Sequence, residues 1–133
     1  MITLDTSGIL SLLDAAEPSH ARCSTALSDD GGPYLVPVSI LGEACYMIER
    51  DLGTQPLLDF LADADEDLFT LDCGDRDVTR IRELIERYDD LHLGFADAAV
   101  AACAERNGGR VLTLDRRDLE VVGRELGLEV LPQ

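Results

Sequence analysis

After Met1 the chain begins with Ile2-Thr3-Leu4-Asp5-Thr6-Ser7-Gly8-Ile9-Leu10, and this segment is the strongest indication of its fold class. Apolar residues run directly into an aspartate, and small polar residues then open an apolar pattern with helical spacing. This pattern predicts a short buried strand, an acid at its carboxyl end, and the start of a helix. Ligands of open α/β sheets bind outside the carboxyl ends of strands, which makes Asp5 a candidate site residue. The alternative is that Asp5 only caps the helix.

The rest of the chain alternates between strand patterns and helix patterns. Further strands are expected at residues 34–37, 68–71, 110–114 and 128–131. Helices are expected up to about residue 16, from 18, between a cap at Ser39 and a stop at Gly53, at 56–64, 75–88 and 95–106, and up to 126. This alternation predicts an α/β fold with three α/β/α layers and a parallel sheet of four to five strands. We expect a single domain spanning residues 1–133.

Composition indicates a globular protein with a substantial core. The chain has 133 residues, of which 46% are hydrophobic. No apolar run approaches the ~20 residues of a membrane-spanning helix, and Asp5 interrupts what would be the apolar part of a signal peptide. The four cysteines lie far apart, with only two histidines, which disfavours a zinc site and a disulfide framework. We therefore expect a cytoplasmic protein with no membrane partner.

Charge is the unusual feature of the composition. The chain has 27 acids against 11 bases, for a formal net charge of −16, and every base is an arginine. Such a field repels polyanions and favours basic partners. It counts against nucleic-acid binding through a broad basic face.

Two acids occur in matching contexts. Asp5 ends Thr3-Leu4-Asp5 and Asp115 ends Thr113-Leu114-Asp115, and each tripeptide closes an apolar strand pattern. Because the carboxyl ends of parallel strands lie at one edge of a sheet, we expect both carboxylates at the same edge.

Two further acids lie on helices that are expected to be largely apolar. Asp97 falls in the first turn of an alanine-rich helix that begins at Phe95. Its alternative role is to complement the helix dipole or to cap the helix. Glu43 lies one turn into the helix expected to be capped by Ser39, and its alternative role is that of a surface glutamate.

Carboxylates that share one apolar-walled site repel each other unless a cation neutralises them. Oxygen ligands with few or no histidines and cysteines favour Mg²⁺ or Mn²⁺. One or two such ions can activate a water molecule and stabilise the departing oxygen of a phosphodiester. They also let an acidic protein approach a polyanion locally.

Four motifs in order carry a resemblance to a known family. They are Leu4-Asp5-Thr6-Ser7, Ile40-x-x-Glu43, Leu93-Gly94-Phe95-Ala96-Asp97-Ala98 and Leu112-Thr113-Leu114-Asp115-Arg116-Arg117-Asp118-Leu119. Together they span nearly the whole chain. The sequence resembles the PIN-domain ribonucleases of the VapC type, the toxin half of a toxin–antitoxin pair.

The resemblance implies a metal-dependent endoribonuclease. In this family the matching acids hold Mg²⁺ or Mn²⁺ for RNA cleavage, and this role carries over to Asp5, Glu43, Asp97 and Asp115. The products would be a 3′-hydroxyl and a 5′-phosphate. The implied partners are an RNA substrate and a cognate antitoxin that neutralises the toxin, and the implied quaternary state is a homodimer.

Several neighbouring residues are secondary candidates. Family members place the fourth acid at the position of Asp115 or of Asp118, one helical turn later, and this chain has both. Arg116 and Arg117 are candidate phosphate contacts, with a solvated helix start as the alternative. Thr6 and Ser7 are expected to cap the first helix, although a hydroxyl there could also hold a metal-bound water.

Two other classes of function remain as alternatives. A phospho-accepting receiver domain would use Asp72, at the end of the third expected strand, but such domains need a lysine and this chain has none. The second alternative is a non-catalytic α/β module that only binds a partner. Such a module has no reason to keep four inward-placed acids.

Overall fold

Five short strands form one parallel sheet in the order β3-β2-β1-β4-β5. The computed structural model describes residues 1–133. The strands are β1 (Ile2–Leu4), β2 (Tyr34–Pro37), β3 (Thr70–Asp72), β4 (Arg110–Leu112) and β5 (Glu129–Leu131). All four neighbouring pairs are parallel, and β1 lies at the centre between β2 and β4. The predicted parallel α/β sheet is confirmed, and it has the upper of the two strand numbers.

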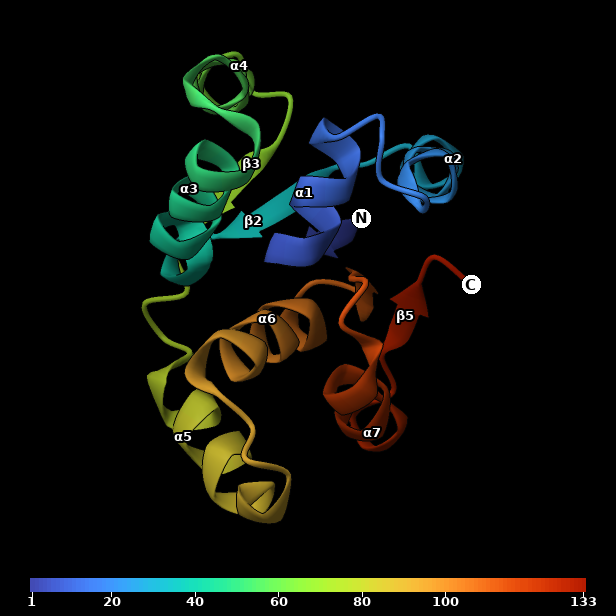
Figure 1. Cartoon of the computed structure of the whole chain (residues 1–133). Coiled ribbons are helices and arrows are strands. Elements are labelled where there is room, and N and C mark those ends of the chain that lie inside the picture. Colours follow the sequence, from blue (N-terminus) through green and yellow to red (C-terminus); the bar gives the residue numbers. More distant parts are fainter.

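Helices cover both faces of the sheet, as predicted (Figure 1). One face carries α1 (Thr6–Leu13), α2 (His20–Asp30), α3 (Val38–Leu52) and α4 (Thr54–Asp65). The other carries α5 (Val78–Arg87), a short 3₁₀ turn η1 (Asp89–Leu91), α6 (Phe95–Arg106) and α7 (Arg116–Leu126). The chain changes face after β3 because it then runs back across the sheet to β4, and right-handed crossovers in opposite directions lie on opposite faces.

The core is centred on α6. Every residue from Ala98 to Ala104 is buried, and the helix packs against α5, α7, β1 and β4. On the opposite face α3 buries Ile40, Ala44 and Ile48, which recur every four residues and form one stripe. The helices α3 and α6 also contact each other, although they cover different faces. This contact brings together the two helices that carry Glu43 and Asp97.

Three predicted element boundaries are wrong for identifiable reasons. β3 begins at Thr70, because Phe69 stacks on Phe60 of α4 with ring centroids 4.8 Å apart. Ser39 does not cap α3, because the helix already begins at Val38, directly after Pro37 ends β2. β4 ends at Leu112, because the amides of residues 114 and 115 bond to a serine hydroxyl instead of a strand.

Smaller differences affect three helix starts and two other boundaries: α1 ends at Leu13, not near residue 16, and β5 begins at Glu129, not at residue 128. The three helices begin at His20, Thr54 and Val78, whereas the predicted starts were residues 18, 56 and 75. None of the helices is long and apolar enough to cross a membrane.

The sheet has one point at which the strand order reverses. From β1 the chain adds β2 and β3 on one side, and later β4 and β5 on the other. A crevice forms at such a point, outside the carboxyl ends of the two central strands, and it is the usual ligand site of open α/β folds. In this chain β1 and β4 flank that crevice.

Candidate metal and active site

Asp5 follows β1 directly and lies at the strand-order reversal. It is also the N-cap of α1, and its Oδ1 accepts a hydrogen bond from the amide of Thr6 at 2.8 Å. The prediction that Thr6 or Ser7 caps this helix is therefore wrong. The residue is only 6% exposed. Burial raises the pKa of the Asp5 carboxyl, and a hydrogen bond from Thr113 acts in the opposite direction.

Asp97 lies in the first turn of α6 and is partly buried. Its pKa is raised to about 6, first by burial and then by repulsion from the charges of Asp5, Asp115, Asp118 and Glu43. The structure therefore brings the four predicted acids and the secondary candidate into one electrostatic cluster around Asp97. We call these five residues the acid cluster.

The two acids of the β4–α7 segment differ in their surroundings. Asp115 occupies the N-cap position of α7 and is exposed. Asp118 lies one turn further on, and its side chain is only 24% exposed. Its Oδ1 is buried without a hydrogen-bond partner, and Arg117 approaches the same oxygen only to 3.6 Å. A buried carboxylate oxygen without a partner is costly, so Asp118 is the better placed of the two for a cation.

Glu43 lies one turn into α3, and its side chain is exposed. It approaches the cluster from the face of the sheet opposite to α6. Of the four acids whose charges raise the pKa of Asp97, Glu43 has the smallest effect. The structure thus places Glu43 at the rim of the acid cluster.

The acid cluster suits a hard divalent cation. All of its donors are carboxylate oxygens, the ligands that Mg²⁺ and Mn²⁺ prefer. The raised pKa of Asp97 and the lack of a hydrogen-bond partner for Asp118 Oδ1 are both features that a cation would offset. No three of the side chains lie close enough together to enclose an ion. A cation would be enclosed only if these side chains moved closer together.

The two arginines beside Asp115 have different surroundings. Arg116 donates to the carbonyls of Pro132 and Val130 and pairs with Glu120 at 2.7 Å. Its guanidinium therefore covers the outer edge of β5, a common way of protecting an edge strand. Arg117 is 87% exposed and lies next to Asp118. Of the two predicted phosphate contacts, Arg117 has the more exposed side chain.

Sequence reasoning missed the role of Thr113. Its hydroxyl donates to Asp5 Oδ2 at 2.7 Å, the shortest hydrogen bond made by any acid of the cluster. Ser7, which was predicted to be a helix cap, contacts the same oxygen at 3.3 Å. The repeated Thr-Leu-Asp tripeptide was the available signal, but only its aspartates were considered.

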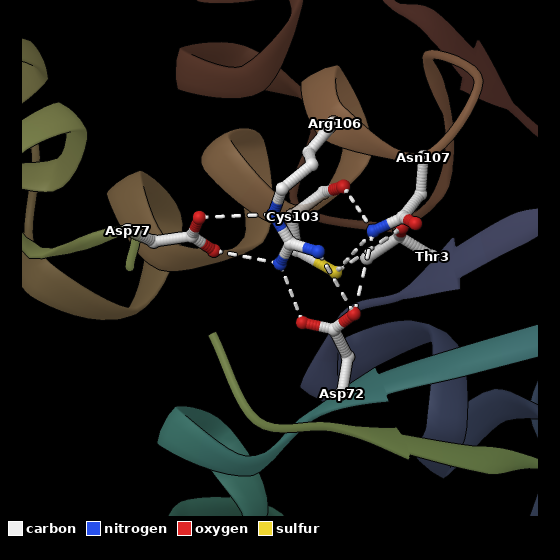
Figure 2. Close-up of polar contacts among 6 residues, drawn as sticks. All are labelled: Thr3, Asp72, Asp77, Cys103, Arg106 and Asn107. Carbon is white, nitrogen blue, oxygen red and sulfur yellow. Dashed lines mark hydrogen bonds and ion pairs between the residues drawn. The ribbon is translucent and has the colours of Figure 1, made fainter. Parts of the chain in front are cut away.

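Asp72, the residue on which the receiver alternative depended, is held in a different cluster (Figure 2). Its carboxylate accepts from Nη2 of Arg106 at 2.5 Å, and the same guanidinium binds Asp77 through Nε at 2.9 Å. The hydrogen bond from Arg106 lowers the pKa of Asp72. Asp72 is therefore a structural partner of α6 and not a free phosphoacceptor. Figure 2 also shows Thr3, Cys103 and Asn107 beside this ion cluster.

Comparison with known proteins identifies the class. The family model of the PIN domain matches residues 2–125. The chain therefore belongs to the PIN-domain family, and this excludes the receiver alternative.

Similar proteins narrow the class further. The chain is 32% identical over 116 residues to ribonuclease VapC26 of Mycobacterium tuberculosis, with 86% of each sequence covered. Its fold is similar to that of Mycobacterium tuberculosis VapC20, described as a toxin that cleaves the sarcin–ricin loop, with a TM-score of 0.76 and 20% identity. That match covers 91% of this chain and 95% of VapC20. Within the PIN-domain family, the chain thus belongs with the VapC-type ribonucleases.

Proposed function

We propose that this VapC-type toxin is an endoribonuclease that cuts RNA with Mg²⁺ or Mn²⁺ held by Asp5, Glu43, Asp97 and Asp115. One observation carries the proposal. The pKa of Asp97 is raised to about 6 by burial and by the charges of the other members of the acid cluster. A fold that places like charges around a partly buried carboxylate loses stability, and a divalent cation removes that cost.

The residues of the cluster divide into inner and outer acids. Asp5, Asp97 and Asp118 are buried or partly buried and form the inner part of the cluster, whereas Glu43 and Asp115 would reach the ion from the solvent side, from which water and RNA arrive. Asp118 is the alternative to Asp115 as the fourth ligand. When bound, the cation would supply an activated water and stabilise the charge that develops on the leaving oxygen. Asp5 keeps its orientation through hydrogen bonds to both of its oxygens.

RNA has to approach a protein of net charge −16. The cation offsets this repulsion at the acid cluster, and the exposed Arg117 offers a phosphate contact next to Asp118. Binding to RNA is then local and depends little on a broad basic surface. We expect the affinity for RNA to have a shallow dependence on salt concentration, because few phosphates are neutralised by arginine.

The partner that fits this surface is an antitoxin with a basic segment. An arginine of that segment would neutralise the acid cluster in place of the cation, which is consistent with the field of an acidic protein. We further propose a homodimer, as the family resemblance implies, acting in the cytoplasm where RNA and antitoxin meet.

The test measures cleavage of a labelled total-RNA substrate with Mn²⁺, with Mg²⁺ and with EDTA. Asp5→Asn and Asp97→Asn remove one inner carboxylate each while keeping the side-chain shape. We expect EDTA to abolish cleavage and each variant to lose roughly 10²-fold or more in rate, because a metal ligand contributes several kcal/mol to the transition state.

Asp65→Asn is the matched control, because Asp65 is exposed at the end of α4, outside the acid cluster. It removes the same charge and should leave cleavage unchanged. Full activity of Asp5→Asn or Asp97→Asn would refute the metal site. Cleavage that persists in EDTA would refute metal dependence.

A further inference from the structure

Two hydroxyl groups join the segments that carry the inner and outer acids. Thr113 is fully buried, and its Oγ1 donates to Asp5 Oδ2 at 2.7 Å. Ser7 lies in the first turn of α1, and its Oγ accepts from the amides of Leu114 at 2.9 Å and Asp115 at 3.3 Å. The two hydroxyl oxygens are 3.0 Å apart. Ser7 and Thr113 together therefore contact Asp5 on one side and the β4–α7 turn on the other.

The hydrogen bonds of this pair connect Asp5 to the β4–α7 turn. A hydroxyl has one proton to donate and two lone pairs that accept. Thr113 gives its proton to Asp5 and accepts from the amide of Asp115 at 3.0 Å. Its second lone pair is free for the proton of Ser7, whose own lone pairs accept the two turn amides. Ser7 Oγ also lies 3.3 Å from Asp5 Oδ2, so its proton can go either to Thr113 or to that carboxylate, and either bond links Ser7 to the Asp5 side of the pair.

Gly8 lies where α1 packs closely against β4. A Cβ atom at Gly8 would lie 2.5 Å from the backbone oxygen of Leu112 in β4. No side chain fits at that distance, so α1 approaches β4 more closely than any other residue would allow. This approach is what brings Ser7 Oγ within reach of the amides of Leu114 and Asp115.

Thr3 supplies an internal comparison. Like Thr113 it is a fully buried threonine followed by leucine and aspartate. Its hydroxyl contacts only the sulfur of Cys103, at 3.7 Å, and reaches no acid of the cluster. A buried threonine in this sheet therefore does not need a carboxylate partner, and the bond from Thr113 to Asp5 is a specific feature.

We propose that Ser7 and Thr113 are positioning residues, a hydroxyl pair that fixes Asp5 and the turn carrying Asp115 relative to each other before any cation binds. The effect that we expect on RNA cleavage rests on the proposed function. The positioning itself is a property of the metal-free protein and can be measured there.

The first experiment measures amide hydrogen exchange by NMR in metal-free protein. Ser7→Ala removes the acceptor of the Leu114 amide and the longer of the two hydrogen bonds of the Asp115 amide, so we expect Leu114 to exchange about tenfold faster and Asp115 to show a smaller increase. Thr113→Val keeps the shape of the side chain and removes its hydroxyl, so we expect faster exchange at Asp115. Thr3→Val, the matched control, should leave both amides unchanged.

The second experiment measures RNA cleavage with Mn²⁺ under multiple turnover. We expect Ser7→Ala and Thr113→Val each to lower kcat by about 10–100-fold, as loss of a group that orients a metal ligand commonly does. KM for RNA should change by less than about threefold, because neither Ser7 nor Thr113 is a proposed contact for an RNA phosphate. Thr113→Ser restores the hydroxyl and should recover most of kcat, which a purely structural role of the methyl group would not predict.

The outcomes separate this proposal from the proposed function. If Ser7→Ala leaves the exchange of Leu114 and Asp115 unchanged, the hydroxyl pair does not hold the turn and the proposal is overturned. If Thr113→Ser fails to recover kcat while Thr113→Val loses it, the positioning role of the hydroxyl is also overturned. If the unmodified protein cleaves no RNA with Mn²⁺, the proposed function fails, and the exchange data alone then decide whether the pair positions Asp5 and the turn.

Discussion

The segments Thr3-Leu4-Asp5 and Thr113-Leu114-Asp115 have the same sequence but different places in the fold. Thr3 pairs with Val111 and Leu4 with Leu112, so Asp5 lies level with Thr113 and not with Asp115. The second tripeptide is therefore shifted outward by two residues. Its threonine stands where the first has its aspartate, and this shift makes Thr113 the hydrogen-bond partner of Asp5.

The shift also gives the two aspartates different degrees of burial. Asp5 is buried at the strand end, whereas Asp115 is exposed at the start of α7. Asp118, one turn later, supplies the partly buried acid on that side. Equal motifs at the ends of neighbouring strands therefore need not be equivalent, because strand register and the point at which pairing ends decide which side chain faces which.

The largest expected effect compares Asp5→Asn with Asp115→Asn in RNA cleavage. Asp5→Asn should lower the rate by roughly 10²–10³-fold, because a buried metal ligand is lost. Asp115→Asn should lose only about tenfold, since Asp118 can serve on the same side. Single-turnover rates with Mn²⁺ measure both. Equal losses would mean that the two tripeptides are equivalent despite their different register.

A second comparison tests the close approach of α1 to β4 at Gly8. Gly8→Ala places a Cβ 2.5 Å from the backbone of β4, so we expect the free energy of unfolding to fall by about 1–3 kcal/mol. Gly42→Ala is the matched control on α3, because no atom lies within 4 Å of its Cβ. It should raise stability by about 0.5–1 kcal/mol through helix propensity. Urea unfolding measures both, and a neutral Gly8→Ala would show that the two segments can move apart.

The smallest expected effect concerns stability against pH in metal-free protein. Asp97 has a folded pKa of about 6 against 3.8 for the ordinary group, so the folded state binds a proton that the unfolded chain releases. Its contribution to stability is therefore lost as pH rises from about 4 through 6. Asp97→Asn should be more stable at pH 7 by roughly 1 kcal/mol, a figure reduced for solvent screening, and should show little gain at pH 4.

The same titration distinguishes the two tripeptides. Among the neighbouring charges, that of Asp5 raises the pKa of Asp97 most, and that of Asp115 has the second-largest effect. Asp5→Asn should therefore lower the pKa of Asp97 more than Asp115→Asn does, as read from the Asp97 carboxyl signal in NMR. Asp65→Asn controls for net charge. The reverse order would place Asp97 nearer to Asp115 than the structure does.

Several features of the fold that depend on one residue or one short pattern were predicted correctly from the sequence. Alternation of strands and helices predicted the parallel sheet, because a chain of apolar strands and amphipathic helices has few arrangements that bury the apolar surfaces of both. Apolar context around Asp97 predicted a partly buried acid for the same reason. Boundaries failed where a contact from another segment competed, as when Phe60 held Phe69 out of β3.

The layers, the family resemblance and the candidate acids could be predicted from the sequence alone, because these depend on local pattern and on residue chemistry. Only the tertiary structure decided how the acids divide into inner and outer members. It also decided that Arg116 covers the edge of β5 and that Thr113 holds Asp5. The bond from Thr113 to Asp5 depends on the register between β1 and β4, and no local pattern in the chain encodes the distance between segments a hundred residues apart.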